Sequence, residues 1–166
     1  MKKSLIAVVA SITATTLALV FFAYDFWQEH KEIIQADKAV YQYIKASVEG
    51  DDDLYRKVTV RSAHGILETG HHAFPNNAKD MKERYFIKRF SHDLKDNKLY
   101  YYIEYYSPAH DTKYADNLEM IKDQDGNWKS DSLLGIEGRV MKAKIKGHEK
   151  DGVIVHSYKE GEKVER

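Results

Sequence analysis

Glu104 is the side chain of this sequence best placed to do chemistry, because it lies within the run YYYIEYY. Burial among aromatic rings would raise the pKa of a carboxyl group toward the range of a general base. Alternate residues of a β-strand share one face of the sheet. One face would carry Tyr100, Tyr102, Glu104 and Tyr106, and the other Leu99, Tyr101, Ile103 and Tyr105.

Leu99 and Ile103 indicate that their side of this strand faces the core. Glu104 would then lie in water beside a lysine or arginine of a neighbouring strand, since carboxylates are seldom buried unpaired. We call the set Tyr100, Tyr102, Glu104 and Tyr106 the tyrosine face and predict it as a site for a ligand or partner. Cover by an added C-terminal hairpin, residues 138–158, would account for the same tyrosines, and no catalytic residue is assigned.

Other residue types exclude several kinds of chemistry. The sequence has no cysteine, which removes disulfides, thiol catalysis and cysteine-based zinc sites. Among its histidines, His64, His71 and His72 lie closest together, but their spacing matches no zinc signature. There is no glycine-rich phosphate loop and no nucleophile elbow. We therefore predict neither a metal site nor a cofactor.

Residues 4–24 contain no charged side chain and follow Met1-Lys2-Lys3 directly. At about 1.5 Å per residue, a helix of this length covers roughly 31 Å, which matches a bilayer core. Phe21 is too bulky for cleavage after Ala23, so a retained single transmembrane helix is favoured over a signal peptide. The positive-inside rule leaves residues 1–3 in the cytoplasm and places residues 25–166 outside, with lipid around residues 4–24.

The remaining part of the chain has the length of one domain. Two of the 26 Lys and Arg residues precede the uncharged run, whereas all 26 Asp and Glu residues follow it. The domain therefore has a slight negative charge, which argues against binding of nucleic acid.

The expected elements of this domain follow an α+β order. Apolar residues at spacings of three and four predict an amphipathic helix over 25–48 that stops at Gly50, and Asp51-Asp52-Asp53 is typical of a helix cap. Short helices are expected over 62–70 and 78–84. Antiparallel strands of a curved sheet are expected over 85–91, 99–106, 113–122 and 128–134. Alternation of Met141, Ala143 and Ile145 with lysines predicts an added C-terminal β-hairpin over 138–158.

This order of elements resembles the cone-shaped fold of the nuclear transport factor two-like superfamily. The resemblance covers core residues 33–134, from the helix ending ASVEGD (46–51) to the segment LEMIKDQDGNWKSD (118–131). It implies helices packed on a curved sheet. The superfamily contains isomerases, dehydratases, binding proteins and structural modules, including membrane-tethered components of secretion and conjugation machines. No catalytic motif of the family matches these residues.

The sequence thus predicts a membrane-anchored extracytoplasmic binding or scaffold module, with an envelope protein or a second copy as partner. A bacterial cell envelope or a secretion or conjugation assembly is the expected setting. Two alternatives stay open: a small envelope enzyme that uses the cone pocket, and a metal or ligand sensor built on the three neighbouring histidines.

Overall fold

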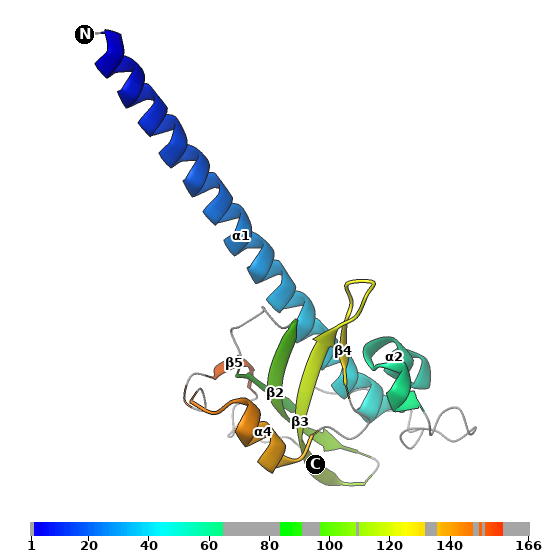
Figure 1. Ribbon diagram of the computed structural model, residues 1–166. Helices are drawn as coiled ribbons and strands as arrows, with labels where there is room; N and C mark the ends of the chain where they lie inside the picture. The colour runs from blue at the N-terminus through cyan, green and yellow to red at the C-terminus, as the bar shows by residue number, and fades with distance from the viewer. Residues whose placement is uncertain are drawn as a thin grey trace. The chain divides into compact units, whose positions relative to one another are not determined.

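The computed structural model describes residues 2–64, 84–90, 97–108, 110–131, 136–147, 150 and 152–157, with side chains from Thr15 onward. The chain divides into two compact units, Met1–Ile34 and Gln35–Arg166. Helix α1 (Lys2–Glu49) contributes to both units (Figure 1).

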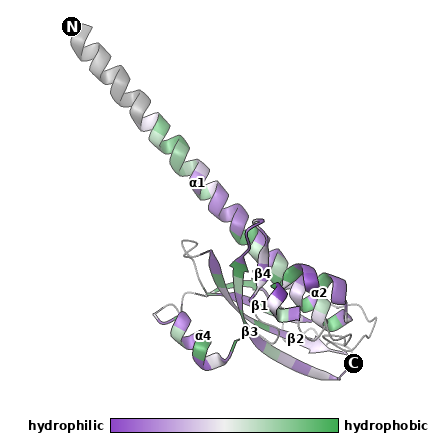
Figure 2. Ribbon diagram, turned by 45° about the vertical axis from the view of Figure 1, so that its right-hand side comes forward, coloured by the Kyte–Doolittle hydropathy of each residue, from purple (hydrophilic) through white to green (hydrophobic). Residues whose placement is uncertain are grey.

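The first unit presents large apolar side chains on successive positions of α1. More than half of the surface of each of these side chains is exposed: Leu17, Leu19, Val20, Phe21, Phe22, Tyr24, Phe26 and Trp27. Figure 2 shows this apolar stretch between the grey N-terminal residues and a hydrophilic part of the helix. Among the residues that the structure describes, no helix is long and apolar enough to span a bilayer. Side chains 4–14 of the predicted span lie outside that description.

The second unit begins with the amphipathic part of α1. Ala36, Val40, Tyr43 and Ile44 are fully or almost fully buried, at the spacing of one helical face. The helix ends at Glu49, where Gly50 adopts a φ of 69° and donates its N–H to Ala46 O at 2.9 Å. A positive φ favours glycine at this position, which confirms the predicted stop.

The aspartate cluster caps helix α2 (Asp52–Val58), as predicted. The Asp51 carboxylate accepts a hydrogen bond from Leu54 N at 2.9 Å, and Asp52 and Asp53 lie in the first turn. After α2, Val60 N donates to Ser130 O, and the 3₁₀ helix η1 (Arg61–His64) follows. Residues 65–83, which include most of both predicted short helices, lie outside the described residues.

Within the described residues, five antiparallel strands form an open sheet in the order β4-β3-β2-β1-β5. The strands are β1 (Tyr85–Arg89), β2 (Lys98–Ser107), β3 (Thr112–Lys122), β4 (Trp128–Ser130) and β5 (Val153–His156). Figure 1 shows the C-terminal part of α1 behind the sheet. The predicted α+β class and the strands over 85–91, 99–106 and 113–122 are therefore confirmed. The predicted fourth strand is shorter than expected, and residues 132–135 lie outside the described residues.

Strand β2 alternates between buried and half-buried residues along its whole length. Leu99, Tyr101, Ile103 and Tyr105 enter the core, where they meet Tyr43, Ile44 and Tyr55 from the helices. The prediction about the two faces of this strand is confirmed. Packing of phenol rings replaces much of the aliphatic core of an ordinary domain.

The predicted hairpin over 138–158 is wrong. Its first half is helix α4 (Gly138–Lys144), and its second half, β5, pairs with β1 instead. Met141 and Ile145 are buried one helical turn apart, and Ile145 N donates to Met141 O at 3.0 Å. Ala143 is exposed, so its alternation with lysine does not reflect a buried strand face. The spacing of four residues between Met141 and Ile145 is the part of the pattern that reflects burial.

Candidate functional site

The tyrosine face carries an ion pair at its centre. Glu104 accepts a hydrogen bond from the Tyr102 hydroxyl at 2.6 Å and pairs with Lys113 of β3. Lys113 and then Tyr102 hold the pKa of the Glu104 carboxyl below its ordinary value. The same hydrogen bond, with some burial, raises the pKa of Tyr102 to about 12. Lys113 and Tyr102 therefore hold Glu104 as a carboxylate, and its lowered pKa makes it a weaker base than a free carboxylate.

The other members of this face are also engaged. The Tyr106 hydroxyl donates to Asp111, and the Arg84 guanidinium lies 5.0 Å from the centre of the Tyr106 ring. The Tyr102 ring packs edge to face against the Phe86 ring, with 6.2 Å between the ring centroids. All four predicted site residues are half-buried on one side of β2. The structure brings them together but links Tyr106 to a different set of partners from Tyr102 and Glu104.

The inner side of the sheet is packed in the described part of the chain. Tyr43, Tyr55 and Tyr101 are almost fully buried there. Asp116 of β3 is half-buried and accepts a hydrogen bond from the Tyr105 hydroxyl at 3.4 Å. Burial raises the pKa of the Asp116 carboxyl. Sequence reasoning missed this carboxylate, although strand alternation with Leu118 and Met120 was the signal that could have found it.

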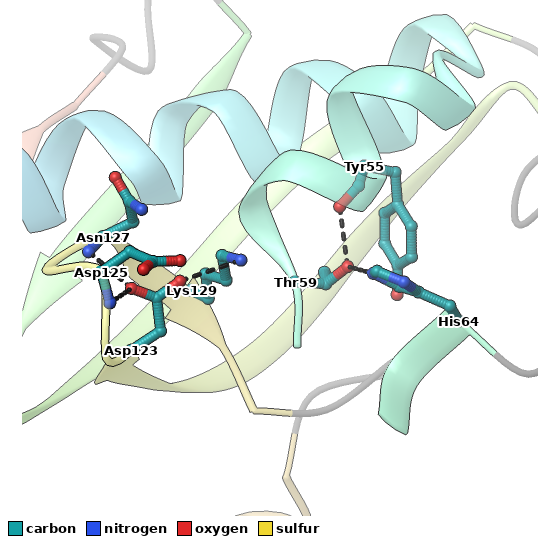
Figure 3. Close-up of polar contacts among 7 residues, drawn as sticks. All are labelled: Tyr55, Thr59, His64, Asp123, Asp125, Asn127 and Lys129. Atoms are coloured by element: carbon teal, nitrogen blue, oxygen red, sulfur yellow. Dashed lines mark hydrogen bonds and ion pairs between the residues drawn. The ribbon is translucent and has the colours of Figure 1, made fainter. Parts of the chain in front are cut away.

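Of the three neighbouring histidines, His64 lies in the described part of the chain, and its contacts there are structural. His64 Nε2 lies 3.0 Å from Thr59 Oγ1, and that hydroxyl donates to Tyr55 O at 2.7 Å (Figure 3). His71 and His72 lie outside the described residues. Within the described residues, no group of three or more His, Cys, Asp or Glu side chains is arranged to hold a metal ion.

A groove of about 740 Å³ lies between α1, α2 and the turn that joins β3 to β4. Four cationic side chains from the three segments line it, and two glutamines of α1 lie beside them. They are Lys38, Arg56, Lys57, Lys129, Gln35 and Gln42. We call this set the basic groove. Sequence reasoning missed it because its cations are dispersed over residues 38–129 and form no run.

Asp123 positions one of these cations. Its Oδ1 accepts hydrogen bonds from Asp125 N at 3.0 Å and Asn127 N at 2.8 Å, and its Oδ2 lies 2.9 Å from Lys129 Nζ (Figure 3). Burial opposes ionisation of Asp123, but the bonds from Asn127 and Lys129 outweigh it and lower its pKa. The Asp123 carboxylate thus stabilises the turn between β3 and β4 and also holds Lys129 at the groove.

No protein-family model, curated protein or solved structure matches this chain. The resemblance to the nuclear transport factor two-like superfamily therefore stays a prediction, and the α+β architecture stands on the geometry alone.

Proposed function

We propose that the chain is a single-pass, membrane-anchored extracytoplasmic binding or scaffold module, in a bacterial cell envelope or a secretion or conjugation assembly. The observation that carries the proposal is the exposure of successive apolar side chains in the first unit, from Leu17 to Trp27. Exposing a Leu, Val or Phe side chain to water costs about 1.5–3 kcal/mol relative to burying it. Lipid around residues 4–24 would remove that cost.

The flanking residues support one orientation. Lys2 and Lys3 precede the apolar run, and Asp25 and Glu29 follow it. The ring centroids of Tyr24 and Trp27 lie 6.4 Å apart at the end of the run. An aromatic belt at this position would lie at the level of the lipid headgroups. Lys31 Nζ lies 5.5 Å from the centre of the Trp27 ring, as expected for a cation near that level. The C-terminal unit then lies outside the cell membrane.

Binding is favoured over catalysis because Glu104, the carboxylate of the tyrosine face, is already engaged by other side chains. Glu104 already has Lys113 and Tyr102 as partners, and tyrosines fill the inner side of the sheet. An envelope protein or a second copy of the chain is the proposed partner.

Single cysteines test the topology, because the native chain has none and gives no background. A cysteine inserted between Met1 and Lys2 reports the N-terminal side without removing either lysine, and exposed Asp125→Cys reports the domain. In intact bacteria a membrane-impermeant maleimide should label Asp125→Cys, and it should label the inserted N-terminal cysteine only after lysis. The reverse pattern, or recovery of the chain in the medium, would overturn the proposal.

Charges within the apolar run test the anchor itself. An arginine at the centre of a membrane helix costs about 3 kcal/mol on insertion scales, and two arginines within the run should together prevent stable insertion. Leu17→Arg combined with Val20→Arg should release the chain from carbonate-washed membranes, whereas the matched apolar pair Leu17→Ile and Val20→Leu should stay bound. Retention of both variants would mean that residues 4–24 do not hold the chain in lipid.

A further inference from the structure

We propose that the basic groove binds an acidic peptide segment of a partner protein. This inference deepens the proposed binding function and rests on it for the nature of the partner. It concerns a different surface from the tyrosine face, on the side of the sheet that α1 and α2 cover.

The charge of the groove is unbalanced. Lys38, Arg56 and Lys57 are exposed, and within the described part of the chain no carboxylate pairs with any of them. Lys129 is the member with an ion-pair partner, Asp123. Among the described residues, three cations without an ion-pair partner therefore line one groove of a slightly acidic domain. Such a surface is complementary to a negatively charged partner and would accelerate its approach.

The kinds of side chain favour a peptide with Asp or Glu residues. The Arg56 guanidinium can hold a carboxylate through two parallel hydrogen bonds. Gln35 and Gln42 lie seven residues apart on α1, with Lys38 between them, and line the same groove. Their carboxamides both donate and accept hydrogen bonds, as the backbone of an extended peptide requires.

The aromatic residue of the groove argues against sugars and nucleobases. Trp128 lines the groove, but only 4% of its surface is exposed. Recognition of single-stranded nucleic acid relies on aromatic rings on which bases stack, and such a ring is not offered here. The volume of about 740 Å³ lies within the range of pockets that hold small ligands, and it suits a short stretch of peptide.

The test uses the full chain in zwitterionic detergent and a fluorescein-labelled octaglutamate peptide, with binding followed by anisotropy. Arg56→Glu combined with Lys57→Glu should weaken binding by about tenfold or more, since both charges are reversed at the groove. The matched control reverses two exposed lysines of α4, Lys142→Glu and Lys144→Glu, and should change binding by less than about twofold. Equal losses in the two variants would overturn the site.

A second readout locates the peptide. The chain has two tryptophans, so Trp27→Phe leaves Trp128 as the fluorophore. Octaglutamate should shift the emission of Trp128 in this background, because Trp128 lines the groove, and Arg56→Glu with Lys57→Glu should abolish the shift. Anisotropy binding with no change in Trp128 emission would place the peptide elsewhere and overturn the proposal.

Competitors separate the acidic peptide from other anions. Inorganic polyphosphate and vesicles of anionic lipid should displace octaglutamate less well than unlabelled octaglutamate does at equal charge. Stronger displacement by either one, or dimerisation that the same charge reversal abolishes, would overturn the peptide as occupant. Cysteine labelling in intact cells does not depend on the groove. Loss of peptide binding with the predicted labelling pattern would reject the groove alone, whereas a reversed pattern would reject the proposed function.

Discussion

Arg89 and Asp37 form a largely buried ion pair in which Nη1 of the arginine lies 2.5 Å from Oδ2 of the aspartate. The pair joins β1 to α1, and the Tyr101 hydroxyl donates to the other carboxylate oxygen at 2.8 Å. Removal of one member of a buried pair leaves the other charge without compensation, which costs about 3–5 kcal/mol. The link between helix and sheet therefore depends on both charges.

Asp37→Ala should lower the free energy of unfolding by about 3 kcal/mol, because it strands the Arg89 guanidinium. Urea unfolding in detergent, followed by Trp128 fluorescence in the Trp27→Phe background, measures the change. Glu137→Ala is the control, since Glu137 pairs with Arg139 on the surface and its loss should cost less than about 1 kcal/mol. Equal costs for the two substitutions would show that the buried pair does not stabilise the fold.

Asp116 predicts a specific dependence of stability on pH. Burial raises the pKa of this carboxyl above its unfolded value, so the folded state binds the proton more tightly. Stability from this group is present below the unfolded pKa and is lost as pH rises through the folded pKa. Asp116→Asn should therefore be more stable than the native chain at neutral pH, and the difference should vanish in acid. A variant that is less stable at neutral pH would contradict this sign.

Helix α4 and the hairpin expected from the sequence bury different residues, so two substitutions distinguish them. In the helix Met141 is buried and Ala143 is exposed, whereas a strand would place both on one face. Met141→Ala should lower the unfolding free energy by about 2 kcal/mol or more through loss of packing. Ala143→Glu should cost less than about 0.5 kcal/mol, as exposed substitutions do. A severe effect of Ala143→Glu in urea unfolding would favour the hairpin.

Gly126 should resist substitution for a reason of backbone conformation alone. Its φ is 83°, and an added Cβ would meet Lys122 Cε at an ordinary 3.7 Å. Gly126→Ala should therefore cost about 1–2 kcal/mol, and Gly126→Asn should cost less, since asparagine tolerates positive φ. Gly138→Ala is the matched control, because its added Cβ would also have room, 3.8 Å from Asn117. Similar thermal unfolding of the Gly126→Ala and Gly138→Ala variants would contradict the assignment.

Regular elements were predictable where one physical signal acted alone. The Gly50 stop and the Asp51 cap depend on local backbone chemistry, and the two faces of β2 depend on strict alternation. The α4 segment failed because lysines at every second position imitate a strand while burial selects only Met141 and Ile145. Local alternation carries no information about which neighbours a segment will meet.

The tyrosine face and the basic groove both show that sequence patterns predict contacts within one element but not contacts between distant elements. Tyr102 and Glu104 are close in sequence and share a face, so their proximity was foreseeable. The neutralising partner Lys113 comes from another strand, and its type could be expected but not its position. Lys38, Arg56 and Lys129 meet only because two helices and a turn pack together, which no local pattern records.

The phenol-rich core makes the fold sensitive to alkali. Burial raises the pKa of Tyr43, Tyr55, Tyr101 and Tyr105 above that of a free phenol. A raised folded pKa means that these groups stabilise the fold below the ordinary phenol pKa and cease to do so as base is added. Deprotonation of the interior and loss of tertiary structure should therefore occur as one event, and the ultraviolet absorbance of phenolate would record both.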